Sequence, residues 1–197
     1  MFQQGVVMQS MADVKGDVGE VITASSLRNN CNMTVIRNIY LPYRDHFTEI
    51  DMVAIGRLGI FVIENKNYDA RVTGNIRDKY WNVEYSRWCS YKLYNPLLQN
   101  KLHKQAIMDL LSLYDLLNIP VYKPVIFNDK GSIDIKDGNK CIFTLSNFVA
   151  TYNSIEVSIL DSYDVSNIAY IFKQFSNLSD EMKLYHKKLL GLERCRC

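Results

Sequence analysis

Two runs rich in apolar residues, 49–55 and 60–66, flank the turn sequence GRLG. Two glycines within four residues are typical of a turn between strands, so the pattern predicts a β-hairpin. Counting outward from the turn places Asp51 opposite Glu64. Because side chains alternate along a strand, one face of the hairpin is expected to carry Asp51, Val53, Ile55, Ile60, Val62, Glu64 and Lys66.

A helix is predicted before the hairpin, over residues 10–29. Its apolar positions recur at intervals of three and four, as on an amphipathic helix, and are Met11, Val14, Val18, Val21 and Ile22. Gly16 and Gly19 each weaken a helix by about 1 kcal/mol relative to alanine. We therefore expect another part of the chain to approach this helix closely. Glu20, on the same turn, is then able to reach toward the hairpin.

A second helix is predicted over residues 95–118, because Asn95-Pro96 is a good helix start and Pro120 ends the pattern. Its apolar stripe, expected to pack on the sheet, consists of Leu98, Leu102, Ala106, Leu110, Leu113 and Leu117. Gln99 and His103 lie four residues apart at the edge of this stripe nearest the helix start, so both could overhang the charged face of the hairpin. We expect His103 to be partly exposed. Two C-terminal helices are predicted over residues 166–175 and 180–190.

The remaining strands complete an α/β fold with a mixed sheet. Residues 34–41, ended by Pro42, together with the hairpin and residues 70–76 and 80–85, predict a meander of about five strands. A strand over 121–127 that returns after the long helix makes the sheet mixed. Two further short strands are expected at 132–135 and 140–145.

Composition excludes some classes of protein but does not identify the function. The chain has 197 residues, of which 48% are hydrophobic and 22% charged, as in a soluble globular domain. A net charge of +2 is too small to indicate a nucleic-acid partner by bulk charge. We find no signal peptide or membrane span and expect a cytoplasmic protein. The five cysteines are irregularly spaced and do not suggest a disulfide framework.

The paired carboxylates of the hairpin allow two interpretations. Carboxylates held side by side need a cation or a shared proton. Lys66 is one such cation, and it could bridge Glu64 and Glu49 in a purely structural ion cluster. The other interpretation is a Mg²⁺ site, because hard cations bind one or two carboxylates and complete their shell with water and phosphate oxygens. The hairpin alone leaves both open.

These residues resemble a known nuclease superfamily. Asp51, followed thirteen residues later by Glu64-Asn65-Lys66, resembles the D…ExK signature of PD-(D/E)xK nucleases. Further pieces resemble the nuclease-related domain (NERD) branch, and in order along the chain they are GDVGE at 16–20, EID at 49–51, KN at 66–67 and NPLLQN at 95–100. Ile50 stands where the signature has proline.

The resemblance implies a restriction-endonuclease-like core, a central mixed β-sheet flanked by helices, and cleavage of DNA. It implies that Asp51, Glu64 and the backbone carbonyl of Asn65 hold Mg²⁺, with Mn²⁺ as a substitute, and that Glu20 holds the metal directly or through water. Lys66 would orient or deprotonate the attacking water. Gln99 matches the glutamine of the family motif and is carried over as a site residue.

A nucleic-acid footprint is predicted over residues 85–108, which contain no acidic residue. The candidate contacts are Arg87, Lys92, Lys101, His103 and Lys104. Tyrosines and Trp88 recur through the first half of this segment, either as stacking surfaces for bases or as ordinary packing.

We expect a nuclease-related domain over residues 1–150 and a helical extension over 151–197 that packs on it. With no helicase segment in the chain, a separate helicase or similar protein is a possible partner. Two rival functions stay open at this stage. One is a nucleic-acid-binding module with little activity of its own, and the other is an interaction protein with a structural ion cluster.

Overall fold

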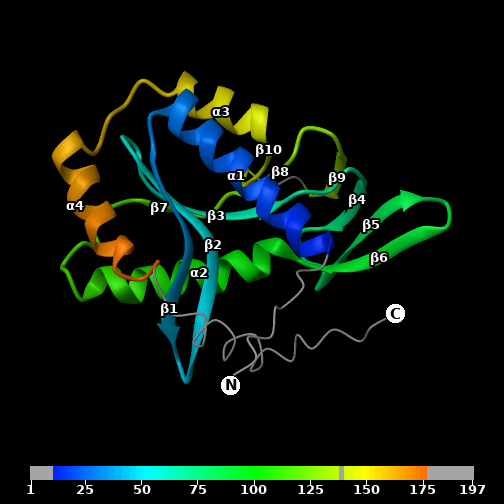
Figure 1. Cartoon of the computed structure of the whole chain (residues 1–197), viewed down its shortest axis with the longest axis horizontal. Helices are drawn as coiled ribbons and strands as arrows, with labels where there is room; N and C mark the ends of the chain where they lie inside the picture. Colours follow the sequence, from blue (N-terminus) through cyan, green and yellow to red (C-terminus); the bar gives the residue numbers. More distant parts are fainter. Residues whose placement is uncertain (1–10, 138–139, 177–197) are drawn as a thin grey trace, which may run out of the picture.

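The computed structural model describes residues 11–137 and 140–176, which form a mixed α+β fold with helices on both faces of a central sheet (Figure 1). The central sheet has the order β1-β2-β3-β8-β10, with β7 also paired to β3. Its strands are β1 Thr34–Tyr43, β2 His46–Gly56, β3 Gly59–Lys66, β7 Val121–Tyr122, β8 Val125–Phe127 and β10 Ile142–Thr144. The helices are α1 Met11–Cys31, α2 Pro96–Ser112, α3 Leu145–Ser154 and α4 Ser162–Lys173.

The predicted hairpin and its register are confirmed. β2 and β3 pair antiparallel from Gly56 with Gly59 to Met52 with Ile63. Gly59 has φ +130°, and a Cβ there would lie 2.4 Å from the Pro120 carbonyl oxygen, so the turn needs glycine at this position. One residue beyond the last pair, Asp51 lies beside Glu64, where the two strands stop pairing.

The sheet is mixed, as predicted, because the chain returns parallel to β3 after α2. β7 and β8 both pair parallel with β3, and Lys123-Pro124 interrupt the single strand that the pattern indicated. Pro42 does not end β1, which continues to Tyr43. β1 is an edge strand, where the missing N–H of proline can be tolerated.

The prediction of a single five-stranded meander was wrong. β4 Arg71–Asn75, β5 Tyr80–Ser86 and β6 Cys89–Tyr94 leave the central sheet and form a second sheet with β9 Ser132–Lys136. The reason is that β7 and β8 occupy the free edge of β3, so β4 has no edge to join there. The segment 132–135 was correctly expected to be a strand, and it pairs parallel with β4.

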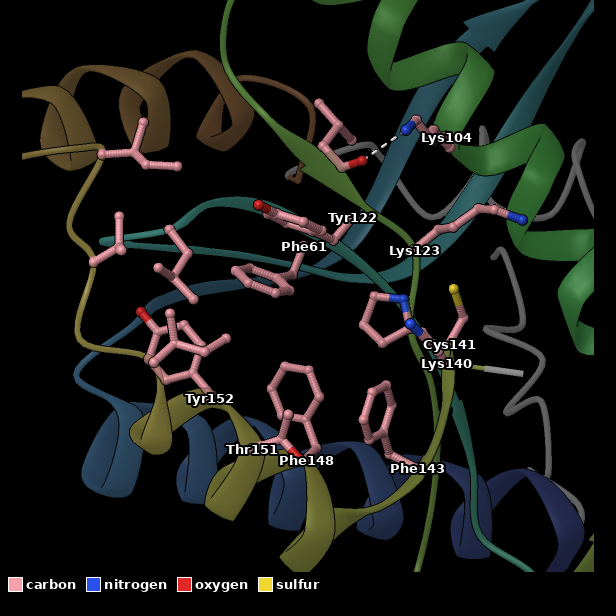
Figure 2. Close-up of a pocket in the computed structure, with 16 residues that line it drawn as sticks. Phe61, Lys104, Tyr122, Lys123, Lys140, Cys141, Phe143, Phe148, Thr151 and Tyr152 are labelled. Carbon is pink, nitrogen blue, oxygen red and sulfur yellow. Dashed lines mark hydrogen bonds between the residues drawn. The ribbon is translucent and has the colours of Figure 1, made fainter. Parts of the chain in front are cut away.

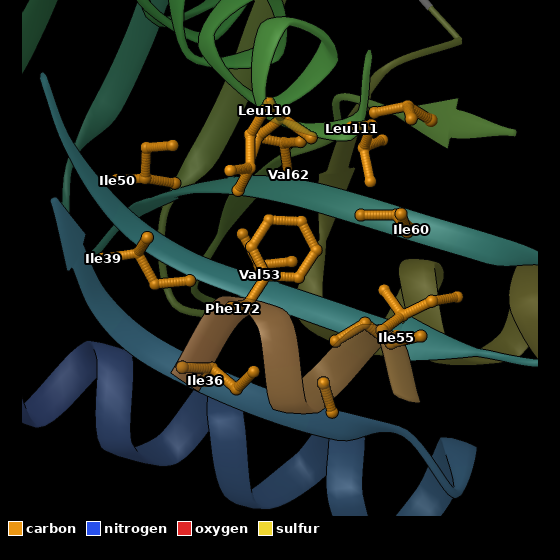
Figure 3. Packing of buried hydrophobic residues seen from close by; sticks show 14 of the residues in the cluster. Ile36, Ile39, Ile50, Val53, Ile55, Ile60, Val62, Leu110, Leu111 and Phe172 are labelled. Atoms are coloured by element: carbon orange, nitrogen blue, oxygen red, sulfur yellow. The ribbon is translucent and has the colours of Figure 1, made fainter. Parts of the chain in front are cut away.

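The central sheet is buried on both faces. Figure 3 shows the cluster between the sheet, α2 and α4, in which Val53, Val62 and Phe172 meet. The opposite face packs against α1 and α3 through Met52, Phe61 and other apolar residues. Over residues 52–55 of β2 and 60–63 of β3, successive side chains thus point to opposite faces of the sheet.

Helix α2 is shorter than predicted and rotated relative to the predicted stripe. It ends at Ser112, and Leu102 and Leu113 are 45% and 78% exposed. The residues that it buries are Pro96, Leu97, Asn100, His103, Ala106, Ile107, Leu110 and Leu111. The apolar pattern misplaced this face because two of its buried positions, Asn100 and His103, are polar.

The C-terminal part contains a helix that the sequence did not indicate, α3, and α4 begins earlier than predicted. Asp161 caps α4 through a capping box with Asp164, which fixes the earlier start. The predicted helix over 180–190 lies outside the described residues. Cys31, Cys89 and Cys141 are not joined by disulfides, and the other two cysteines lie outside the described residues.

Helix α1 has nearly the predicted bounds, but its apolar stripe was wrong. Val14, Val18, Val21 and Ile22 are exposed, whereas Ala24, Leu27 and Cys31 are buried. The close approach predicted from the glycines occurs at Gly19, where a Cβ would lie 2.5 Å from the Asn67 Cβ. The helix therefore packs Ala24, Leu27 and Cys31 against the sheet and brings Gly19 close to Asn67.

Replacing the two glycines of α1 by alanine should have opposite effects on stability. Gly19→Ala should lower the free energy of unfolding by roughly 1–3 kcal/mol, since Asn67 must move. Gly16→Ala should raise it by about 0.5–1 kcal/mol, because nothing lies within 4 Å of a Cβ there and alanine favours the helix. Urea denaturation of both variants measures these changes. Equal effects at the two positions would contradict the contact between α1 and Asn67.

Candidate active site

The end of the β2–β3 hairpin brings together the carboxylates and the amine that the sequence singled out. The Lys66 Nζ lies 2.5 Å from the Glu64 Oε1, and Glu64 is fully buried. The backbone N–H of Asn65 donates to the Asp51 Oδ2 at 2.9 Å. A bridge from Lys66 to Glu49 is not among the ion pairs of the described residues. Instead, Glu49 accepts a hydrogen bond from the Tyr40 hydroxyl at 2.5 Å.

Helix α2 closes this cluster with His103. Its Nδ1 lies 3.4 Å from the Glu64 Oε2, and the side chain is 5% exposed. The expectation of a partly exposed histidine was therefore wrong. Burial lowers the pKa of His103 to about 4, so at neutral pH the imidazole is uncharged and this contact is not an ion pair.

The charges at the cluster are strongly coupled. Burial, followed by the nearby Asp51 carboxylate, raises the pKa of Glu64 to about 8, while the Lys66 ammonium acts in the opposite direction. Burial lowers the pKa of Lys66, but the carboxylates of Glu64 and Asp51 outweigh this and raise it above its usual value. Lys66 thus stays positively charged at neutral pH.

A divalent cation fits these residues chemically. Apart from the ion pair with Lys66, the Glu64 oxygens have no hydrogen-bond partner among the described residues. A buried carboxylate whose only donor among these residues is an ammonium, with a second carboxylate beside it, offers the oxygen ligands that hard cations use. In the described part of the chain, no three Asp, Glu, His or Cys side chains gather as a complete metal site. Backbone carbonyl, water and phosphate oxygens would have to fill the shell.

Glu20 reaches the cluster from α1, but it has a partner of its own. The Arg37 guanidinium donates to its Oε2 at 2.9 Å. Burial and the Asp51 carboxylate raise the pKa of Glu20 to about 7, although Arg37 opposes this. Glu20 is therefore within electrostatic range of Asp51, and it would have to share its carboxylate with Arg37 in order to hold a metal.

The alternation of Glu64-Asn65-Lys66-Asn67 links the cluster to α1. Glu64 and Lys66 face α2, while Asn65 accepts a hydrogen bond from the Thr23 hydroxyl at 2.8 Å. The Asn67 amide donates to the Lys15 carbonyl at 2.7 Å. These contacts explain why asparagines occupy both positions after the carboxylate. The sequence alone indicated no role for Thr23 or Asn67.

Two asparagines of the NPLLQN segment have structural roles, of which the sequence predicted the helix cap at Asn95 and not the role of Asn100. Asn95 caps α2 by accepting from the Leu97 N–H at 2.9 Å. Asn100 is fully buried and donates to the carbonyls of Val62 and Pro124, at 3.0 and 2.9 Å. Asn100 therefore fixes α2 against β3 close to the carboxylates. Gln99, the predicted site residue, is half-buried one turn before His103.

The predicted nucleic-acid contacts occupy different environments. Arg87, Lys92 and Lys101 are exposed, whereas His103 is buried in the carboxylate cluster. The Lys104 ammonium donates to the Val121 carbonyl at 2.6 Å and so links α2 to β7.

An apolar pocket has a volume of about 490 Å³ and is lined by none of the side chains of the carboxylate cluster (Figure 2). Aromatic rings of β3, β7 and α3 form its walls, and Phe61 stacks on Tyr122 with ring centroids 4.8 Å apart. Its lining residues include lysines but no Asp or Glu side chain. It therefore lacks the groups that the cluster on β2 and β3 provides.

The chain matches the sequence model of a known protein family. The sequence model of the nuclease-related domain (NERD) matches residues 15–128, which extend from α1 to just after β8. The chain belongs to the nuclease-related domain family. The matched region contains Glu20, Asp51, Glu64, Lys66 and Gln99. In this NERD protein, α3 and α4 lie beyond the matched region, and the predicted domain boundaries stay a prediction.

One related protein has a name that states no function. An uncharacterized protein from Bacillus anthracis is 29% identical over 164 residues, which cover 81% of this chain and 73% of the relative. No solved structure matches the chain significantly. Among the described residues, no helix combines the length and the apolar character that crossing a membrane requires.

Proposed function

We propose that this NERD protein is a metal-dependent nuclease that hydrolyses phosphodiester bonds in DNA. The observation that carries the proposal is the fully buried Glu64 carboxylate, which lies beside Asp51 and pairs with the Lys66 ammonium. Membership of a nuclease-related family supports the same reaction class.

Each residue has a role that its position supports. Asp51 and Glu64, with the Asn65 carbonyl, would hold Mg²⁺ or Mn²⁺, and Glu20 would contribute directly or through water. A bound divalent ion would lower the pKa of water and stabilise the charge that develops on the phosphate. Lys66, held beside Glu64, orients the attacking water. His103 and Asn100 position the strand that carries Glu64.

Cleavage of supercoiled plasmid by the purified chain tests the proposal. With Mg²⁺ or Mn²⁺, the unmodified protein should produce nicked or linear DNA, and chelation should stop the reaction. Asp51→Ala and Lys66→Ala should each remove this activity, because the first removes a metal ligand and the second a positive charge beside the water. Equal nicking by all three proteins would show that the activity arises elsewhere.

A second candidate is a nucleic-acid-binding module that cuts little DNA without a partner protein such as a helicase. The ion pairs of Glu64 with Lys66 and of Glu20 with Arg37 favour it, because they neutralise the carboxylates without a metal. In that case Asp51→Ala would still shift DNA in a gel, and no metal-dependent product would form.

A further inference from the structure

The β5–β6 hairpin extends away from the body of the molecule, at the right of Figure 1. Its tip carries Arg87 and Trp88, and Trp88 is 89% exposed. The other tryptophan of the chain, Trp81, is fully buried at the base of the same hairpin. A single exposed apolar residue is common on protein surfaces, so Trp88 is a candidate ligand contact only together with the aromatic rings that continue from it.

A row of tyrosines connects this hairpin to the candidate active site. Tyr85 stacks on Tyr91 with centroids 6.2 Å apart and planes at 29°. Tyr91 meets Tyr68 edge to face at 6.1 Å. Tyr68 follows Lys66 by two residues and lies close enough to interact electrostatically with its ammonium. The three rings therefore lead from the cluster toward the hairpin tip.

The same row lies on the core-facing side of the hairpin. On β5, Trp81 and Val83 are buried, and Tyr85 continues their face outward. Tyr85 and Tyr91 are each 42% exposed, so their rings line a surface rather than fill the core. Their exposure favours the stacking interpretation of these aromatics over ordinary packing.

The charge beside the row suits a nucleic-acid strand. The Lys15 Nζ lies 5.8 Å from the centroid of the Tyr85 ring, and it also pairs with Asp69 at 3.5 Å. Arg87 at the tip adds an exposed cation, whereas the exposed Lys92 alternates to the opposite face of β6 from Tyr91. Glu84 lines one pocket together with Tyr85 and Arg87, so one carboxylate lies among these cations.

Exposed aromatic rings distinguish unpaired from paired nucleotides. A ring gains free energy by stacking on the face of a base, and each face is available in a single strand but covered by its neighbours within a duplex. Contacts with a duplex backbone would instead use cations, of which this hairpin has few.

We propose that the β5–β6 hairpin binds unpaired nucleotides next to the candidate active site, with Trp88 and the tyrosines as stacking surfaces. The preferred substrates would then be DNAs with a single-stranded segment, such as a flap or a fork. This inference rests on the proposed nuclease function for the position of the cut, but the binding itself can be measured without cleavage.

Tryptophan fluorescence tests the binding in the full chain without metal ions. Oligothymidylate should quench the emission of Trp88, while a blunt duplex of equal length should not, and the buried Trp81 gives a constant background. By anisotropy of a labelled oligothymidylate, Trp88→Ala should bind about tenfold more weakly, and Trp88→Phe should retain most of the affinity. The control Tyr163→Ala, at a 73% exposed aromatic on α4, should bind as the unmodified protein does.

The outcomes separate this inference from the proposed function. Equal quenching by single strand and duplex, or unchanged affinity of Trp88→Ala, would overturn the role of the hairpin even if the protein cleaves plasmid. The exposed tryptophan would then be better explained by a protein partner. If oligothymidylate selectively quenches the emission but the protein cleaves no DNA, nucleotide binding by the hairpin would be supported and the proposed nuclease activity would be overturned.

Discussion

Replacing Glu64 by glutamine should lower the rate of metal-dependent DNA cleavage by at least roughly a hundredfold, because a bound metal contributes several kcal/mol to the transition state. Glutamine has nearly the same shape but no negative charge. Since Glu64 is fully buried and its pKa is raised by burial, the neutral side chain should not unfold the protein. Initial rates of plasmid nicking, together with circular dichroism, measure both quantities.

Glu49→Gln is the matched control for this experiment. Glu49 lies two residues before Asp51 on the same strand and accepts a hydrogen bond from Tyr40, which an amide oxygen can also accept. Its replacement should leave the cleavage rate within about twofold, as expected of a change outside the reacting groups. A comparable loss in both variants would indicate a general effect of charge on β2 and β3, and the assignment of Glu64 would fail.

Replacing Phe172 by alanine should lower the free energy of unfolding by roughly 3–5 kcal/mol, as for other buried phenylalanines. Phe172 is fully buried in the cluster between α4 and the central sheet (Figure 3). For a chain of this length, such a loss corresponds to a decrease in Tm of roughly 6–20 °C. Thermal and urea denaturation provide the measurement.

Tyr170→Ala, two residues earlier on the same helix, is the control. Tyr170 is 68% exposed, so its replacement should change stability by less than about 0.5 kcal/mol. Similar small effects at both positions would mean that α4 does not belong to the same cooperative unit as the sheet. That result would also contradict the predicted packing of the C-terminal extension on the nuclease-related domain.

The sequence predicted the hairpin well because strand periodicity is two and the turn is marked by Gly56 and Gly59. Register then follows by counting, and with it the meeting of Asp51 and Glu64. The buried faces of α1 and α2 were harder to predict. On α2, the buried face includes Asn100 and His103, whose polar partners come from distant parts of the chain. No local hydrophobic pattern contains that information.

The strand that pairs with the edge of β3 could not be predicted from local sequence either. Whether β4 continues the meander depends on which strand reaches the free edge of β3 first, and that strand follows much later in the sequence. Helix α1 could not be oriented either, because the contact that decides it joins Gly19 to Asn67. The glycine pattern indicated close approach without naming the partner.

The candidate site was predictable where the family motif and the strand geometry agreed, at Asp51, Glu64 and Lys66. The supporting residues were not, because Arg37, Thr23 and Asn100 act through contacts between separate elements. His103 was expected to overhang the charged face of the hairpin but to stay partly exposed. Its full burial against Glu64 depends on the rotation of α2, which the apolar pattern misplaced.

Titration of the protein with Mn²⁺ by calorimetry tests most directly whether Asp51 and Glu64 converge on one cation. The account predicts saturable binding of one ion to the unmodified chain and to Glu49→Gln, and loss of that binding in Glu64→Gln. Equal binding by Glu64→Gln, or no binding by the unmodified chain in the presence of a DNA oligonucleotide, would contradict it.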